Sequence, residues 1–199
     1  WQMDEERLRR QMTFLAEADK MKSVLRQTLL ADGSRRENDA EHSWHFALTG
    51  MILFEYAHSA EVDLCRILQM ALVHDMVEIY AGDAFCYDPE ANRGKLERER
   101  AAADRLFALL PEEQGAYYRG LWEEFDAMET PDAKYAAAMD RIQPLINNYL
   151  TKGHTWKLGR VSSADVYKRM DMVRVGTPAL WPMVEFIVND SIRQGFLQP

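Results

Sequence analysis

Apolar residues recur at three- and four-residue intervals along most of this chain, and no stretch shows sustained alternation of apolar and polar residues. The first spacing predicts amphipathic helices, and the lack of the second argues against strands. Helices are predicted over about Met3–Val24, Asp39–Tyr56, Val62–Tyr80, Lys95–Leu110, Pro131–Leu150, Ser163–Val175 and Pro178–Ile192, with one more starting at Pro111. The pattern therefore predicts an all-α fold.

Residue types at the segment ends support these boundaries. The predicted caps are Asp39, Thr130 and Thr177, and the predicted first-turn prolines are Pro111 and Pro131. Pro144 lies inside its helix, where proline predicts a kink. The helix over 62–80 is apolar on most sides, which is typical of a central helix.

The segments between the helices are a polar stretch over 31–38, a loop over 82–94 and an irregular stretch over 152–161. None of these segments has the composition of a linker between domains, and the sequence contains no internal repeat. A length of 199 residues suffices for one well-buried core. We therefore expect a single domain over 1–199. Its motif-bearing part is expected at about 20–150, with the C-terminal helices, 163–194, packed on it.

Composition narrows the functional class. The formal net charge is −8, whereas a general nucleic-acid surface needs a basic stripe, so we expect no nucleic-acid polymer as a partner. No apolar run approaches the ~18 residues that span a bilayer, so we expect a soluble protein without a membrane partner. Cys65 and Cys86 form no CxxC pair, and we interpret them as buried or idle thiols in a reducing cytoplasm.

Four ligand-type side chains stand among apolar or small neighbours. They are His42, the adjacent pair His74 and Asp75 near the end of the most apolar predicted helix, and Asp140. A buried carboxylate is costly unless it is paired or bound to a metal. Two imidazoles and two carboxylates form a mixed nitrogen and oxygen set that suits a borderline divalent cation. Such a set leaves positions open for water and a phosphate oxygen.

The order His42, His74-Asp75, Asp140 resembles the HD superfamily of metal-dependent phosphohydrolases. The string His74-Asp75-Met76-Val77-Glu78-Ile79-Tyr80-Ala81-Gly82-Asp83, with Glu37-Asn38-Asp39-Ala40-Glu41-His42-Ser43 upstream, is similar to its bacterial 5'-deoxynucleotidase branch. The resemblance implies a helical bundle with one metal between central helices, usually in a homodimer. It also implies hydrolysis of the 5'-phosphate of a deoxynucleoside monophosphate by a metal-activated water.

The resemblance assigns roles by position. His42, His74, Asp75 and Asp140 match the metal ligands, and Glu78 and Asp83 match two acidic residues that are not ligands. Glu78 is expected to deprotonate or orient the attacking water. Asp83, after the flexible Gly82, is expected to hold the sugar or help protonate the leaving oxygen. The identity of the metal is not determined, because Mn, Fe, Co, Ni, Zn and Mg each suit part of this ligand set.

An acidic protein that binds phosphate needs local positive charge. Arg35 and Arg36, in the polar stretch before His42, are the first candidates, because a guanidinium matches phosphate geometry. The similar deoxynucleotidases have an Arg-Trp pair near the end of the first helix, where this chain has Ser23-Val24, so Arg26 is a weaker candidate. Arg141 points either at the site or at a surface acid.

Other interpretations of the same residues are testable. The superfamily's dinuclear members need more histidines, and this chain has none from Asp75 to Gly153, which favours one metal. A regulator that binds a nucleotide with little turnover, an HD hydrolase of another phosphoester, and a structural protein with satisfied core histidines are the alternatives. His45 is expected to support or pack around the site rather than bind the metal.

Overall fold

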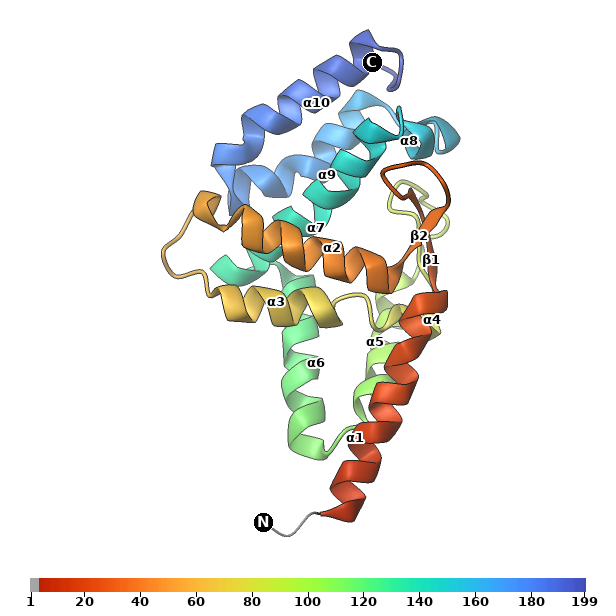
Figure 1. Cartoon of the computed structure of the whole chain (residues 1–199), viewed down its shortest axis with the longest axis vertical. Coiled ribbons are helices and arrows are strands. Elements are labelled where there is room, and N and C mark those ends of the chain that lie inside the picture. Colours follow the sequence, from red (N-terminus) through yellow and green to blue (C-terminus); the bar gives the residue numbers. More distant parts are fainter. Residues whose placement is uncertain (1–3) are drawn as a thin grey trace.

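The computed structural model describes residues 4–199 (Figure 1). Its helices are α1 (Glu5–Ala18), α2 (Asp39–Ile52), α3 (Leu64–Val73), α4 (Glu78–Ala81), α5 (Lys95–Phe107), α6 (Glu112–Ala127), α7 (Pro131–Leu150), α8 (His154–Leu158), α9 (Ser163–Gly176) and α10 (Trp181–Arg193), with 3-10 turns at Asp19–Ser23, Phe54–Tyr56 and Pro178–Leu180. The all-α prediction is confirmed, apart from one small hairpin. Within residues 4–199, no helix is both long and apolar enough to cross a membrane.

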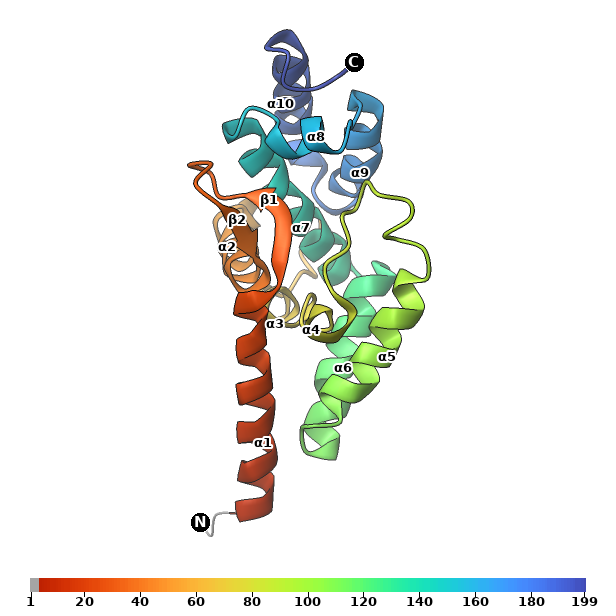
Figure 2. The same ribbon diagram turned by 90° about the vertical axis from the view of Figure 1, so that its right-hand side faces the viewer.

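Helix α7 is the centre of the molecule. Most of its inward positions are small or apolar and fully buried, including Ala136, Met139 and Ile142. It packs against α2, α3 and α6, and against α9 and α10, so the C-terminal helices share its core. Figure 2 shows α1 running beside α5 and α6 at one end of the molecule, with α8, α9 and α10 at the other. These contacts support the single-domain interpretation, which stays a prediction.

The N-terminal region contains a hairpin that the pattern did not predict. β1 (Leu25–Leu29) pairs antiparallel with β2 (Arg36–Asn38), and Leu25 stands opposite Asn38. Strands of five and three residues are too short to produce a readable alternation. Arg36 holds the pair together by donating to the backbone carbonyls of Leu25, at 2.6 Å, and of Arg26.

Two boundaries near the predicted site differ from the expectation. The N-cap of α2 is Asn38, whose side chain and that of Glu41 form a capping box, so Asp39 is the first helical residue and not the cap. The expected helix over 62–80 is broken after Val73. The next backbone groups form hydrogen bonds between residues three apart instead of four, such as Glu78 N–H to the Asp75 carbonyl. Asp75 and Glu78 therefore do not lie on one continuous helix.

The remaining boundaries agree with the pattern or shift slightly. Thr130 caps α7 with Pro131 in its first turn, and Pro144 lies inside α7. Pro111 precedes α6 as its N-cap, and the expected helix from Pro178 begins as a 3-10 turn. The stretch over 152–161 contains α8. The first helix ends at Ala18, and its expected start at Met3 lies outside the described residues.

Close packing of α9 on α7 predicts a large effect at Gly176. A Cβ atom there would lie 2.3 Å from the backbone oxygen of Lys134, so Gly176→Ala is expected to lower the free energy of unfolding by about 1–3 kcal/mol. Gly120→Ala on α6 is the matched control, because a Cβ there meets nothing within 4 Å and alanine favours helix. Urea unfolding measures both, and equal stability of the two variants would contradict the prediction.

Candidate active site

Three of the four predicted metal ligands converge from three helical elements. His42 comes from the first turns of α2, His74 from the end of α3 and Asp140 from the middle of α7, and all three are buried. Asp140 Oδ1 lies 3.0 Å from His42 Nε2 and 3.6 Å from His74 Nε2. One ligand atom from each residue lies within 4.8 Å of the others, a spacing that can hold a metal ion.

The other ring nitrogens indicate which imidazole atoms are free for a metal. His74 Nδ1 lies 3.0 Å from the carbonyl oxygen of Ala71, which can only accept, so Nδ1 carries the proton. His42 Nδ1 lies 2.8 Å from Gln143 Oε1, while the amide nitrogen of Gln143 donates to Glu37 at 3.0 Å. When both rings are neutral, as metal binding requires, their Nε2 lone pairs face carboxylate oxygens. Metal-binding histidines hold their second ring N–H in this way.

The electrostatics of this donor set favour a cation at its centre. Burial disfavours the charged imidazolium of His74, but Asp75 and Asp140 outweigh burial and raise the pKa of His74 to about 10. Burial raises the pKa of the Asp140 carboxyl, but the adjacent His42 and His74 outweigh it and hold that pKa well below its ordinary value. The set therefore attracts positive charge, and its nitrogen and oxygen donors fit a divalent metal ion.

The fourth predicted ligand, Asp75, is shared between the histidines and Arg26. Its Oδ2 lies 3.0 Å from His74 Nε2 and 3.7 Å from His42 Nε2, and it accepts from Arg26 Nη1 at 2.7 Å. Arg26 enters the site from β1, and Asp39 and Glu37 each have a carboxylate oxygen 3.6 Å from its guanidinium. The unpredicted hairpin thus directs this arginine at the acidic residues.

Further carboxylates surround this group. Asp39, Asp75 and Glu78 each bring one oxygen within 4.8 Å of the other two. Burial, together with Asp75, raises the pKa of Asp39 to about 8 and raises that of Glu78 well above its ordinary value. Within residues 4–199, both Asp39 oxygens and Glu78 Oε2 lack a hydrogen-bond donor. Burial also raises the pKa of Asp83, which follows Gly82, a residue with φ of +77°.

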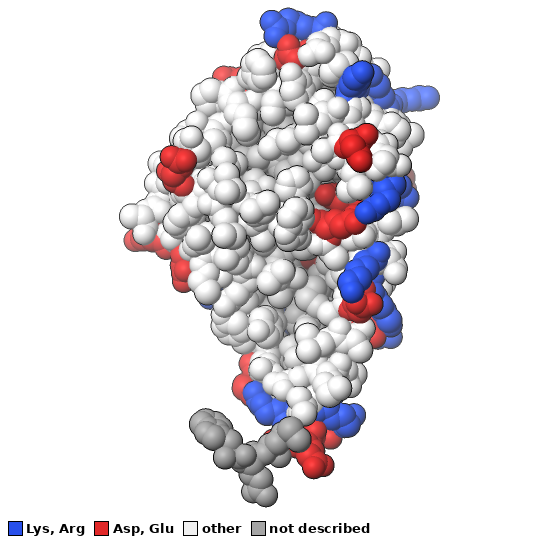
Figure 3. All heavy atoms as spheres, in the orientation of Figure 1, with Lys and Arg blue, Asp and Glu red and all other residues white. Residues whose placement is uncertain are grey.

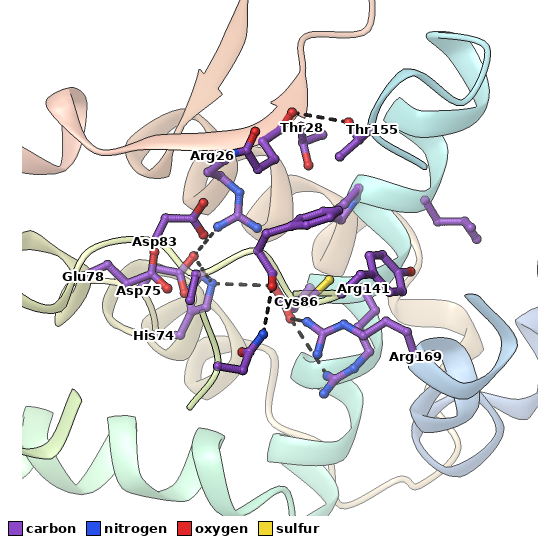
Figure 4. A pocket seen from close by; sticks show the side chains of 18 of the residues that line it. Arg26, Thr28, His74, Asp75, Glu78, Asp83, Cys86, Arg141, Thr155 and Arg169 are labelled. Carbon is purple, nitrogen blue, oxygen red and sulfur yellow. Dashed lines mark hydrogen bonds and ion pairs between the residues drawn. The ribbon is translucent and has the colours of Figure 1, made fainter. Parts of the chain in front are cut away.

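Asp75, Glu78 and Asp83 border a cavity of about 270 Å³, together with His74 and Asp140. Figure 4 shows His74, Asp75, Glu78, Asp83 and Arg26 on one side of it, and Arg141 and Arg169 on the other. Lys95 also lines the cavity, and its Nζ lies 3.9 Å from Glu78 Oε1. Burial and the neighbouring Arg169 lower the pKa of Arg141 to about 10, so its guanidinium stays charged near neutral pH.

The structure separates the three arginines that were predicted to bind phosphate. Arg26 lines the cavity, whereas Arg35 and Arg36 do not. Arg35 is exposed and makes a bidentate pair with Glu41, at 2.5 and 2.9 Å. Arg36 donates to backbone carbonyls of β1. Both arginines are thus engaged in holding the hairpin and the start of α2.

Other aromatic, histidine and cysteine side chains also have definite places in the structure. Phe85, Tyr87 and Trp156 line the cavity, whereas Trp44 is 64% exposed on α2. His45 Nδ1 lies 3.0 Å from the amide nitrogen of Gln143, and the amide oxygen of the same residue contacts His42. His58 and His154 are exposed. Cys65 and Cys86 are free thiols that reach the surface, so of the two expected forms, buried or idle, the buried one is wrong and the idle one stays a prediction.

Sequence reasoning missed several residues of this cavity. Lys95 and Arg169 line the cavity, and Asp39 lies in the acidic group beside it; each stands in a polar context typical of an exposed helix end or face. Gln143 could have been predicted from the sequence, because it follows Asp140 by three residues and therefore lies on the same face of the helix. A buried amide beside a metal-ligand candidate is suited to orient a histidine.

Comparison with known proteins places this chain in a family. The HD domain family matches residues 18–181. A crystal structure of a predicted metal-dependent phosphohydrolase from Magnetospirillum magnetotacticum is 49% identical, with a TM-score of 0.92, and the match covers 98% of this chain and all of that one.

Curated relatives agree with this placement. A 5'-deoxynucleotidase from Xenopus laevis is 29% identical over 110 residues, which cover 55% of this chain and 53% of the relative. One from Pasteurella multocida is 30% identical over 132 residues, covering 62% and 67%. This chain thus spans between half and two thirds of the length of these relatives. The matched residues, 18–181, contain every ligand that converges in the structure, and the chain belongs to the HD domain family.

Proposed function

We propose that this protein removes the 5'-phosphate of deoxynucleoside or nucleoside monophosphates with one divalent cation, held by His42, His74, Asp75 and Asp140. The convergence of two imidazole Nε2 atoms and carboxylate oxygens at the wall of a cavity lined with cationic side chains carries this proposal. The relatives named 5'-deoxynucleotidases support the substrate class. When bound, the cation would neutralise phosphoryl charge and lower the pKa of water.

The side chains around the donor set suit a hydrolysis. Glu78 has an oxygen without a hydrogen-bond donor, and it is the proposed group that takes a proton from the attacking water. The water oxygen forms a bond to phosphorus, and the bond between phosphorus and the 5'-oxygen breaks. Asp83, whose pKa is raised by burial, is suited to supply the proton that the leaving oxygen needs. Phe85 and Trp156 offer apolar walls to a nucleoside.

Phosphate release from a panel of substrates tests the proposal. The protein would be stripped of metal and then supplied in turn with Mn, Fe, Co, Ni, Zn or Mg, and assayed with deoxynucleotides, ribonucleotides and simple phosphomonoesters. We expect metal-dependent release that is greatest with the 5'-nucleotides. Equal release from every ester would widen the substrate class. No release from any ester, with metal firmly bound, would favour the regulatory interpretation.

The raised pKa of His74 predicts that metal binding is coupled to proton release. A metal needs the Nε2 lone pair, so below pH 10 it must displace the proton held there, and affinity should fall about tenfold per unit as pH drops. Calorimetric titration at neutral pH, in two buffers that differ in ionisation enthalpy, should show about one or more protons released per metal ion. Binding without proton release would contradict this electrostatic picture.

We also propose a homodimer, in the cytoplasm. Trp44, Leu48, Met51 and Ile52 form an exposed apolar stripe at helical spacing on α2, beside the exposed Leu72 of α3. Figure 3 shows that this face carries few charged side chains over α2 and α3. An exposed apolar patch of this kind marks protein interfaces. The free thiols of Cys65 and Cys86 suit a reducing compartment.

A charge placed on this stripe should separate the subunits. Ile52→Glu is expected to halve the mass of the protein in light scattering after size-exclusion chromatography, because a buried unpaired carboxylate is costly. Phe186→Glu is the control, since Phe186 is 57% exposed on α10, away from the stripe. A monomeric wild-type protein, or an Ile52→Glu protein with unchanged mass, would refute the proposed interface.

A further inference from the structure

Two arginines of the cavity have no role in the function proposed above. Arg141 follows Asp140 on α7, and Arg169 lies on α9. Both line the cavity, and Figure 4 shows them side by side, opposite Arg26. The Arg141 side chain is only 10% exposed, whereas that of Arg169 is 38% exposed.

These guanidinium groups are poorly neutralised. The Asp140 Oδ2 atom lies 3.9 Å from Arg141 Nη1 and 3.7 Å from Arg169 Nη2, beyond hydrogen-bond range. No other carboxylate within residues 4–199 approaches either group to 4.0 Å. The stronger contacts of Arg141 are neutral: Nη1 donates to the Ala137 carbonyl at 2.6 Å and Nη2 to Met128 sulfur at 3.2 Å.

Arg26 has the opposite surroundings. Three carboxylates lie within 3.6 Å of its guanidinium, and one of them, Asp75, accepts a hydrogen bond from it at 2.7 Å. Its charge is therefore already used to balance the acidic residues beside the donor set. The surplus positive charge of the cavity lies at Arg141 and Arg169, where two cations share one oxygen of a carboxylate whose other oxygen faces the histidines.

Two like charges placed together in a cavity repel unless an anion lies between them. A phosphate dianion has the charge and the oxygen geometry that paired guanidinium groups bind. We propose that Arg141 and Arg169 form the subsite that grips the non-bridging oxygens of the substrate phosphate, beside Asp140 Oδ2. The inference rests on the proposed function for its substrate. In this proposal the arginine pair binds the phosphate group and favours dianionic phosphomonoesters over singly charged phosphodiesters.

A second explanation of the pair makes a different prediction. If the arginines only position Asp140 as a metal ligand, their loss should weaken metal binding and leave the affinity of the metal-loaded protein for phosphate unchanged. If they form the subsite, their loss should weaken phosphate binding while the metal content stays the same. The two explanations are separated by measuring metal and phosphate independently.

The test uses the full chain, loaded with the metal that it binds, and inorganic phosphate as the probe. Arg169→Gln should raise the dissociation constant for phosphate in calorimetry about tenfold or more, and Arg141→Gln with Arg169→Gln should raise it further, because charge-assisted hydrogen bonds are lost. Arg169→Lys should restore part of the affinity. Arg174→Gln, on the same helix and outside the cavity lining, is the control and should bind phosphate as the wild type does.

Each result has a distinct meaning. Unchanged metal content with weaker phosphate binding and a raised KM supports the subsite. Unchanged phosphate affinity in both variants, or loss of metal alone, overturns it. If the wild-type protein hydrolyses no nucleotide but the variants still lose phosphate affinity, the subsite stands and the proposed function falls. If nucleotides are hydrolysed and the variants keep their phosphate affinity and KM, only the subsite falls.

Discussion

Replacing Glu78 with glutamine is expected to leave the metal in place and to lower turnover about 100- to 10,000-fold, the range that general acid–base catalysis contributes. Glu78 is 3% exposed, its Oε2 has no hydrogen-bond donor within residues 4–199, and it lines the cavity. Glutamine keeps the shape of the side chain but cannot accept a proton from water. The measurement is kcat of the metal-loaded variant, with metal content determined by elemental analysis.

Glu99→Gln is the matched control for this experiment. Glu99 is also a buried glutamate and lies 3.3 Å from Lys95 Nζ, the same cation that lies 3.9 Å from Glu78, but it does not line the cavity. Its loss should leave kcat close to that of the wild type. Full activity of Glu78→Gln would show that the proposed base is wrong. Loss of metal together with turnover would instead make Glu78 a ligand, alongside Asp39 and Asp75.

His42→Ala is expected to remove both the bound metal and the hydrolytic activity. His42 is fully buried, and its Nε2 lies 3.0 Å from Asp140 and 3.7 Å from Asp75, so alanine would remove one nitrogen donor from the centre of the proposed set. Wild-type protein should contain about one metal ion per chain, and added metal should raise its Tm, because a ligand that binds only the folded state stabilises it. The variant should show neither occupancy nor the rise in Tm.

His58→Ala controls for the loss of an imidazole, since His58 is exposed and does not belong to the donor set. It should keep the metal, the rise in Tm and the activity. A His42→Ala protein that retained one metal ion per chain would overturn the proposed ligand set. Retained activity without metal would point to a different reaction mechanism altogether.

The chain by itself determined the helical class and most helix positions, and it singled out the residues of the proposed donor set. Helical periodicity and caps such as Thr130 are local properties, so they can be read without contacts. The buried His42, His74 and Asp140 stood out because charged or polar ligand types among apolar neighbours require an explanation.

Only the tertiary structure decided which charges meet those donors. The hairpin over Leu25–Asn38 depends on cross-strand pairing, and it carries Arg26 into the cavity while Arg35 stays at the surface. Arg169 approaches Asp140 because α9 packs on α7, a contact between residues distant in the chain. Local sequence reports which groups a segment offers, whereas their mutual distances depend on how separate elements pack, and those distances set the charge of the site.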